Sequence, residues 1–212
     1  YIADTGAHVC LAGQELEGFI TPLLAETDLE RVVVASYSTY IKPDTDLKLP
    51  AEVSAPAWSD SVPGLVSWEA AMAEVRVPAE HTAGPDDLAV IPYSSGTTGA
   101  PKGCMHTHRS VMATAIHRIF WNLTTPDSVQ LATLPFFHVT GMTGSMNGPI
   151  AAGAASVIMT RWDRTTASRL IERYKVTGWT NIVTMAVDFL SNPDIGQYDL
   201  SSLNMIGGGG AT

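Results

Sequence analysis

The sequence predicts an α/β fold in which a mostly parallel sheet is flanked by helices, and three observations indicate this class. Short runs of apolar and β-branched residues alternate with longer amphipathic stretches, as in strand–helix–strand units. Most of the short runs are apolar throughout, which is typical of parallel strands covered on both faces. The chain has 212 residues, of which 45% are hydrophobic and 16% charged, so it is long enough to bury a substantial core.

Seven strands are predicted from the apolar runs, in chain order. The runs read HVCL, RVVVAS, LAVIPY, VQLATL, ASVIM, TNIV and LNMI, and they predict strands over residues 8–11, 31–36, 88–93, 129–134, 155–159, 180–183 and 203–206. Each run has the length of an ordinary strand and is rich in residues that favour a pleated, half-buried surface.

Six helices are predicted over residues 14–26, 67–73, 108–122, 143–152, 164–174 and 185–191. The pattern is clearest in the fifth, where Ala167, Leu170, Ile171 and Tyr174 recur at helical spacing after Asp163. Residues 37–63 are rich in proline and lack periodicity, so they predict a surface excursion. The whole chain, residues 1–212, is interpreted as one incomplete α/β subdomain. It begins with Tyr1 and stops just after a run of four glycines, so we expect it to be a piece of a longer protein.

Composition excludes several function classes. The chain has 21 acidic and 12 basic residues, a formal net charge of -9, which disfavours duplex nucleic acid or an anionic membrane as the main partner. No apolar run is long enough to cross a bilayer. Two cysteines, Cys10 and Cys104, form no CxxC pair, which argues against a disulfide framework or a structural zinc site and favours a reducing, cytoplasmic location. The oligomeric state stays open.

One segment concentrates hydroxyls, glycines and a lysine directly after a predicted strand. Residues 93–103 read YSSGTTGAPKG and follow the apolar run that begins at Leu88. Glycine lets successive backbone N–H groups point into one concavity, serine and threonine add hydroxyl donors, and Lys102 supplies a full positive charge. The segment therefore predicts a phosphate-binding loop. It is not a Walker-type P-loop, because Pro101 precedes the lysine and Gly103 follows it. The alternative is a polar surface turn with no ligand.

Charge distribution favours an anion at this place. No aspartate or glutamate occurs between Leu88 and Pro126, whereas Lys102, Arg109 and Arg118 give the stretch a formal charge of +3. Subtracting +3 from the total of -9 leaves -12 on the rest of the chain. We therefore expect an anion to be attracted to this stretch.

The segment YSSGTTGxPKG, followed by His106, Thr107 and His108, resembles the phosphate-binding signature of the adenylate-forming (AMP-binding) enzymes. That superfamily comprises acyl-CoA synthetases, amino-acid adenylation domains and firefly-type luciferases. Residues 134–142, LPFFHVTGM, resemble the acyl-CoA synthetase branch, which includes long-chain-fatty-acid–CoA ligases. Gly209, Gly210 and Ala211 resemble the turn that lines the acyl and nucleotide pocket there. The chain looks like a fragment of the large N-terminal domain of such an enzyme.

The resemblance implies a two-step ligase reaction. A fatty or aromatic carboxylate attacks the α-phosphorus of ATP to give an acyl-adenylate and pyrophosphate, and the thiol of coenzyme A then displaces AMP. Mg²⁺ accompanies ATP, and its protein ligand is expected outside this fragment. The segments that the family uses for adenine, ribose and the adenylation lysine are not in the sequence. We therefore expect the isolated chain to be inactive in adenylation.

The resemblance also assigns residues. The phosphates would lie on Ser94, Ser95, Gly96, Thr97, Thr98, Gly99 and Lys102. His138 would close on the reacting carboxylate, and the alternative is a satisfied histidine in the wall of the core. The acyl group would be bordered by Val139, Thr140, Gly209, Gly210 and Ala211.

Two further interpretations bear on the site. Thr107 is the natural N-cap of the helix over 108–122, so His106 and His108 favour a structural role over a metal site. Because ligands bind beyond the carboxyl ends of parallel strands, we expect the Lys102 loop, His138 and Gly209 to border one cleft. Two other functions remain open: a fragment of an amino-acid adenylation domain, and a non-catalytic nucleotide- or partner-binding module.

Overall fold

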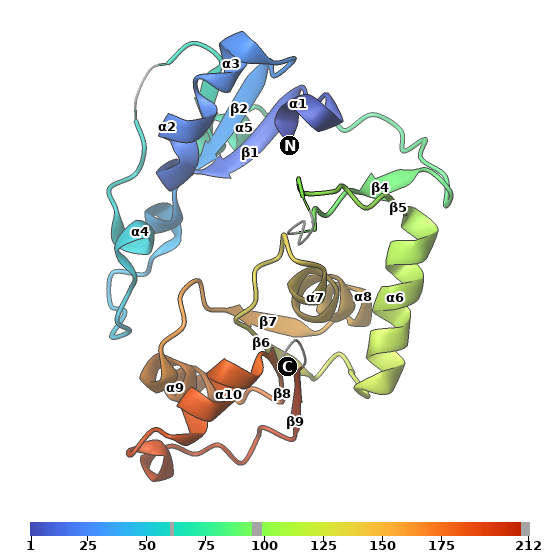
Figure 1. Cartoon of the computed structure of the whole chain (residues 1–212). Helices are drawn as coiled ribbons and strands as arrows, with labels where there is room; N and C mark the ends of the chain where they lie inside the picture. The colour runs from blue at the N-terminus through green and yellow to red at the C-terminus, as the bar shows by residue number, and fades with distance from the viewer. Residues whose placement is uncertain (60–61, 95–98, 209–212) are drawn as a thin grey trace. The chain divides into compact units, whose positions relative to one another are not determined.

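The computed structural model describes residues 1–59, 62–94 and 99–208 (Figure 1). It has the predicted α/β class, with parallel sheets and flanking helices. The chain divides into two compact units, Tyr1–Glu80 and His81–Thr212. Each unit has its own parallel sheet and is described by itself, and the interpretation of residues 1–212 as one subdomain stays a prediction.

The first unit contains a three-stranded parallel sheet. Its strands are β1 (Val9–Gly13), β2 (Arg31–Ala35) and β3 (Leu65–Ser67), in the order β1-β2-β3. The central strand β2 places Val32 and Val34 in the core, fully buried against Ala12 and Leu29. Strand β3 was not predicted, because two apolar residues and a serine between a proline-rich stretch and a helix give no periodic signal; strand β3 is identified by its pairing with β2.

Helices in the first unit are short. Residues 14–26, predicted as one helix, form η1 (Gln14–Leu16), α2 (Glu17–Ile20) and α3 (Leu23–Glu26). Pro22 accounts for the break between α2 and α3, because it has no N–H to continue the helix. The remaining helices are α1 (Ile2–Thr5), η2 (Tyr37–Tyr40), α4 (Ala51–Ser54) and α5 (Trp68–Ala73). Helix α5 is capped by Ser67, whose hydroxyl accepts from Ala70 N at 3.1 Å.

Part of the predicted surface excursion, residues 37–63, packs on the first core. The Trp58 side chain contacts the buried cluster around Val32 and Val34. Its backbone N–H donates to Ser36 Oγ at 3.0 Å, and this hydrogen bond joins the segment to the residue that follows β2. A proline-rich stretch without periodicity can therefore still cover a sheet edge.

The second unit contains a four-stranded parallel sheet. Its strands are β6 (Val129–Ala132), β7 (Ala155–Ile158), β8 (Gly178–Asn181) and β9 (Met205–Gly208), in the order β7-β6-β8-β9. Strands β8 and β9 lie two residues away from the predicted ranges 180–183 and 203–206. All four strands run in one direction, so their carboxyl ends lie at the same edge.

Neighbouring side chains of strand β8 point to opposite faces of this sheet. Trp179 is fully buried and contacts Phe189 of α10 (Val183–Leu190), with ring centroids 5.3 Å apart. The next residue, Thr180, accepts a hydrogen bond from Arg118 of α6 (His108–Trp121). Because side chains alternate along a strand, α10 and α6 lie over opposite faces of the sheet. Helix α9 (Arg164–Tyr174) packs beside α10 and has the predicted bounds, and η4 (Ile195–Gln197) follows α10.

One long helical stretch changes pitch in its middle. It consists of α7 (Val139–Gly141), the π-helical segment η3 (Met142–Asn147) and α8 (Gly148–Ala152). Pro149 has no N–H for the carbonyl of Ser145 four residues earlier, and its ring would collide with that carbonyl in a regular α-helix. The wider π turn avoids the collision, and the freed Ser145 carbonyl accepts from Ser156 Oγ at 2.9 Å. The prediction of one plain helix over 143–152 did not include this turn.

A strand was predicted over 88–93 as part of the mostly parallel sheet, and this assignment to a sheet was wrong. Strand β4 (Leu88–Val90) pairs antiparallel with β5 (His106–Thr107), a strand that was not predicted, and neither belongs to a parallel sheet. A parallel neighbour needs a crossover of a dozen or more residues, usually a helix, whereas here the chain turns back through a glycine-rich loop.

Among the described residues no helix is long and apolar enough to span a membrane.

Candidate functional site

The glycine-rich segment forms a loop that is closed at its base. Tyr93 and Gly103 form an antiparallel bridge, and Ser94 N donates to Lys102 O at 2.9 Å. Below them Cys104 N donates to Pro92 O at 2.9 Å, so the two sides of the loop are held together from residue 92 to residue 104. The predicted phosphate ligands Ser95, Gly96, Thr97 and Thr98 lie outside the described residues.

Glycine is needed at two described positions of this loop. A Cβ on Gly103 would lie 2.7 Å from Ile91 Cγ2, closer than real side chains approach, so the bridge to Tyr93 requires a residue without one. Gly99 has a φ of 155°, a conformation that disfavours any residue with a Cβ. The sequence pattern therefore reflects local geometry at both positions.

Lys102 is an exposed cation at the end of the loop. No hydrogen bond or ion pair of its side chain occurs among residues 1–59, 62–94 and 99–208. Its ammonium group is therefore free of acidic partners in the described part and can pair with an anion. Ser94, the other described hydroxyl of the loop, is also exposed. Its residue type predicts a small buried side chain at Cys104, two residues after Lys102, but Cys104 is exposed.

The second cation of the acid-free stretch is neutralised from outside it. Arg109 donates from Nε to Asp86 Oδ1 at 2.8 Å and from Nη2 to Asp86 Oδ2 at 2.9 Å. The same guanidinium group lowers the pKa of the Asp86 carboxyl from its ordinary value. The predicted anion-attracting charge of +3 was therefore too high, because Asp86 lies two residues before the stretch that was counted.

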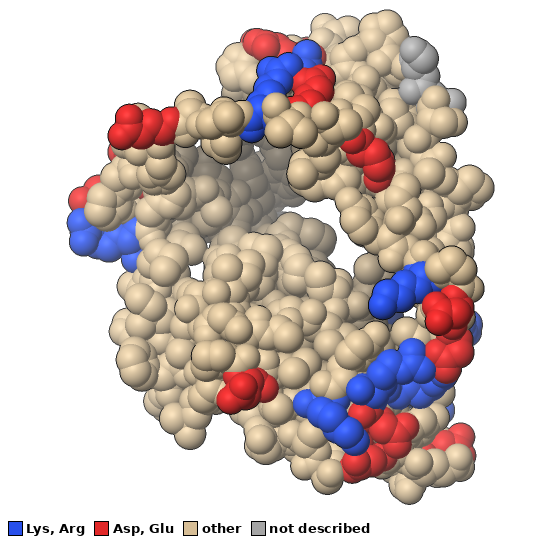
Figure 2. Space-filling view, turned by 180° about the vertical axis from the view of Figure 1, so that it is seen from behind, with Lys and Arg blue, Asp and Glu red and all other residues tan. Residues whose placement is uncertain are grey.

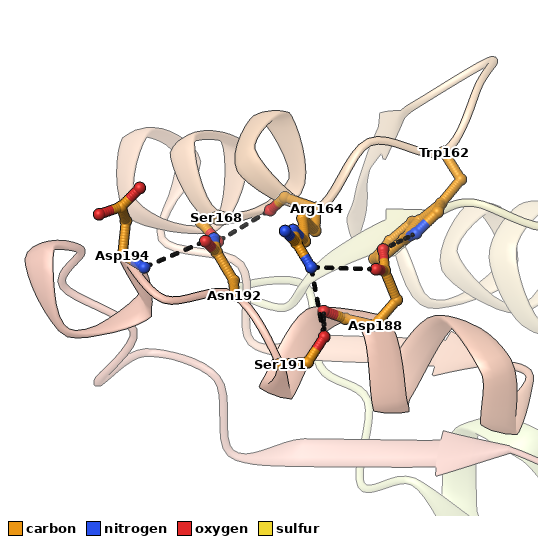
Figure 3. Close-up of polar contacts among 7 residues, drawn as sticks. All are labelled: Trp162, Arg164, Ser168, Asp188, Ser191, Asn192 and Asp194. Atoms are coloured by element: carbon orange, nitrogen blue, oxygen red, sulfur yellow. Dashed lines mark hydrogen bonds and ion pairs between the residues drawn. The ribbon is translucent and has the colours of Figure 1, made fainter.

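Several other cations of the described residues also pair with acidic side chains. On the face drawn in Figure 2, Lys and Arg atoms mostly lie beside Asp or Glu atoms. Figure 3 shows one example, in which Asp188 of α10 accepts from Trp162 Nε1 at 2.8 Å and from Arg164 Nη1 at 3.3 Å. Lys175 and Asp199 form another pair at 2.8 Å. Other cations of the described residues, Lys102 among them, are exceptions to this pairing.

Arg118 is such an exception. It lies in the last turn of α6 and donates from Nη2 to Thr180 Oγ1 at 3.1 Å, while its Nε is buried without a hydrogen-bond partner. No carboxylate pairs with it in the described part of the chain. Sequence reasoning counted Arg118 only as a charge. The absence of acidic residues three or four positions away on the helix was noted only for the stretch as a whole.

His138 follows β6 and starts the long helical stretch. Its ring is exposed, which contradicts the alternative of a satisfied histidine in the core wall. Nδ1 accepts from Thr140 N at 3.2 Å, so the neutral ring carries its proton on Nε2. The turn before it is tight: a Cβ on Gly141 would collide with the carbonyl of Pro135. The backbone thus fixes His138 with a donor nitrogen available.

A pocket of about 350 Å³ lies beside the start of this helix. Its described lining includes Thr140, a predicted acyl-pocket residue, and Arg118, Thr180, Met205, Gly207 and Gly208. Val139, the neighbouring predicted residue, is half exposed and does not line it. Gly209, Gly210 and Ala211 follow directly after the lining glycines but lie outside the described residues.

The shared cleft predicted for the Lys102 loop, His138 and Gly209 stays a prediction. Thr140 and the end of β9 border the pocket at the carboxyl edge of the sheet, but His138 does not line it. Lys102 does not line that pocket, since β4 belongs to a separate strand pair. Gly209 cannot be placed among the described residues.

The two histidines near the loop have structural positions. Thr107 caps α6 as predicted, with Oγ1 accepting from Ser110 N at 3.3 Å. His106 belongs to β5, and His108 donates its backbone N–H to Asp87 O at 3.1 Å. Within the described ranges no three His, Cys, Asp or Glu residues gather as a metal-binding group.

Comparison with known proteins covers the whole chain. A family model described as AMP-binding enzyme matches residues 1–212. A 4-coumarate–CoA ligase of Pinus taeda is 37% identical over 131 residues, which are 60% of this chain and 24% of the relative. A long-chain-fatty-acid–CoA ligase of Bacillus subtilis (strain 168) is 34% identical over 119 residues, 55% of this chain and 21% of the relative. These matches span less than a quarter of each relative.

The fold is shared with solved structures of much lower sequence identity. ATP-bound MatB from Rhodopseudomonas palustris superimposes with a TM-score of 0.72 at 19% identity, over 99% of this chain and 36% of that one. A likeness at this identity supports the fold.

Proposed function

The chain belongs to the AMP-binding enzyme family, and on that premise we propose that it is part of an ATP-dependent acid–CoA ligase. The protein would activate a carboxylic acid as an acyl-adenylate and transfer the acyl group to coenzyme A. The observation that carries the proposal is Lys102: an exposed lysine without an acidic partner in the described residues, at the closed base of a glycine- and hydroxyl-rich loop. Such a group can neutralise a triphosphate.

The charge of the described part of this loop fits a nucleoside triphosphate. Lys102 would pair with the phosphates, and Ser94, Ser95, Gly96, Thr97, Thr98 and Gly99 would surround them. The first half-reaction is a displacement at phosphorus, in which positioning and charge neutralisation contribute most. Mg²⁺, arriving with ATP, would supply further neutralisation of the phosphate charge.

His138 would act on the acid rather than on ATP. Its Nε2–H is a hydrogen-bond donor on an exposed ring whose orientation the Thr140 N–H fixes. A donor in this position can hold a carboxylate oxygen while the other oxygen attacks phosphorus. Thr140, and with it Val139, Gly209, Gly210 and Ala211, would border the rest of the acid.

The pocket disfavours the amino-acid adenylation alternative. An amino-acid substrate carries an ammonium group, which needs a carboxylate beside it. The described lining has no Asp or Glu, and its one charged side chain is Arg118, which would repel an ammonium. Fatty and aromatic acids both remain within the proposal, since relatives of both kinds resemble the chain. We also propose a cytoplasmic location, for which the two free thiols, Cys10 and Cys104, give support.

The test is acid-dependent exchange between ATP and pyrophosphate, measured on the complete gene product. The acids are a panel of cinnamic acids, of straight-chain fatty acids and of straight-chain dicarboxylic acids of increasing length, each with and without coenzyme A. Exchange with at least one acid, and acyl-CoA formation once coenzyme A is added, is the expected result. ATP binding without exchange for any acid would contradict the proposal and favour a non-catalytic nucleotide-binding module.

A further inference from the structure

The pocket beside Thr140 contains an arginine whose charge is not used by the fold. Arg118 makes one hydrogen bond, to the neutral hydroxyl of Thr180 at 3.1 Å, and its Nε is buried without a partner. A buried donor that has lost its water without gaining a partner costs free energy. The described residues contain no acid that pairs with it, so a partner from outside the fold would offset that cost.

The structure makes room for this guanidinium group. It lies against the π-helical segment η3, where a Cβ on Gly144 would be 2.5 Å from Arg118 Nη2. On the sheet side, Thr180 pairs in register with Gly207, which has no side chain to compete for the space. Three separate elements therefore hold Arg118: its own helix α6, segment η3 and strand β8.

The rest of the described lining is neutral. Thr140 and Thr180 contribute hydroxyls, Trp121 an indole, Asn122 a neutral carboxamide, Met205 a thioether, and Gly207 and Gly208 backbone. An alkyl chain that filled this pocket would remove water from the guanidinium group and give it no acceptor, which is unfavourable. A carboxylate matches its planar fork of donors and would form the charge-assisted bonds that the fold leaves unmade.

We propose that Arg118 determines substrate specificity by binding a second carboxylate, so that the acid activated by this protein is a compact dicarboxylic acid. The inference rests on the proposed function, because it assigns the pocket to the acid. One carboxylate of the substrate attacks the α-phosphorus and releases pyrophosphate, and coenzyme A then releases AMP. The other carboxylate stays bound to Arg118 and is unchanged. The volume of about 350 Å³ lies at the small end of ligand pockets, which favours a short acid.

The test compares two acids that differ at one end, hexanoate and adipate. The kcat/KM for pyrophosphate exchange is measured with each acid on the complete gene product, on Arg118→Met and on the control Arg76→Met, whose arginine lies in the first unit beside Glu74. We expect the unmodified protein to prefer adipate. In Arg118→Met, kcat/KM for adipate falls by about tenfold to a hundredfold, as for a lost hydrogen bond to a charged group, while that for hexanoate is unchanged or rises.

Two results overturn the inference: a preference of the unmodified protein for hexanoate, or an equal loss with both acids in Arg118→Met. If Arg118→Met does not fold, Arg118→Lys is measured instead. It keeps the charge without the planar fork, and it must still lose part of the preference for adipate.

Failure of the proposed function gives a different result. If no acid supports exchange, that function is wrong, and calorimetric titration with the same two acids then decides the role of Arg118. Binding of adipate that is weakened in Arg118→Met and unchanged in Arg76→Met upholds the carboxylate site. Equal binding in all three proteins, or no binding of adipate, rejects it.

Discussion

The ring of Trp162 lies flat on the ring of Trp179, with centroids 5.3 Å apart and an angle of 7° between their planes. Phe189 meets the same indole edge-on at 5.3 Å, so strand β8 is clamped between the start of α9 and helix α10. Trp179 also donates from Nε1 to Thr133 Oγ1 at 3.0 Å, so its polar atom is satisfied.

This cluster predicts a large loss of stability in Phe189→Ala. The ring is 3% exposed, and its removal leaves a cavity beside Trp179 that rigid strands cannot fill. The expected cost is about 3–5 kcal/mol of unfolding free energy, measured by denaturant titration followed through tryptophan fluorescence. Leu190→Ala on the same helix is the control, since Leu190 is 70% exposed and its removal is expected to cost far less. Equal costs for both variants would show that the cluster is not a packed core.

Lys102→Ala is predicted to weaken the use of ATP. Removing the one described cation of the loop leaves the phosphate charge uncompensated, and kcat/KM for ATP is expected to fall by about a hundredfold. Steady-state kinetics with ATP as the varied substrate checks this. Lys42→Ala removes an equally exposed lysine from the first unit and must leave the kinetics unchanged. A loss that is as large in Lys42→Ala would assign the effect to total charge.

His138→Ala and His138→Asn separate two contributions of one side chain. Both remove the Nε2 donor, so both are expected to slow acyl-adenylate formation, by about tenfold or more. Only alanine also removes the acceptor for Thr140 N, because the asparagine side chain can cap the helix. Thermal unfolding is therefore expected to change in His138→Ala and not in His138→Asn. Normal exchange rates in His138→Asn would show that the histidine acts through the cap alone.

Lys175 is predicted to lower the pKa of the Asp199 carboxyl. The hydrogen bond from Lys175 lowers the pKa of Asp199, and the backbone N–H and hydroxyl of Ser201 lower it further. A depressed carboxyl pKa contributes stability at pH values above the unfolded pKa, about 3.9, and that contribution is lost as pH falls toward the folded pKa. In Lys175→Gln the pKa of Asp199 rises and stays below its ordinary value, because Ser201 remains.

The measurement is a pH titration of the Asp199 carboxyl carbon by NMR. The carboxyl of Asp86 is the internal control, because its partner Arg109 is untouched. Identical Asp199 curves in both proteins would mean that the ion pair with Lys175 does not form in solution.

The sequence predicted those parts of the molecule whose signals are local. Helix α9 has the predicted bounds because Asp163 caps it, accepting from Thr166 N at 2.7 Å, and its apolar stripe is regular. Thr107 was likewise found from its own residue type. Strand β4 was assigned to the wrong sheet, because an apolar run carries no information about its partner strand.

In the candidate site, too, residues with local sequence signals were predicted and residues that depend on long-range contacts were not. Lys102, His138 and Thr140 were identified from contiguous motifs. Arg118 was not, because its importance comes from contacts with Gly144 and Thr180, which are 26 and 62 positions away. The partner Asp86 of Arg109 was missed since it stands just outside the stretch whose charge was counted.

The π turn in η3 also sets the direction of the side chains before it. A π turn holds one residue more than the α turn it replaces, and one residue of an α-helix corresponds to a rotation of about 100°. Deleting a single residue from Met142–Asn147 would therefore rotate Thr140 about the helix axis, relative to α8, by roughly that angle. Thr140 would then leave the wall that it shares with Arg118. The shape of this pocket thus depends on a single extra residue in the helix.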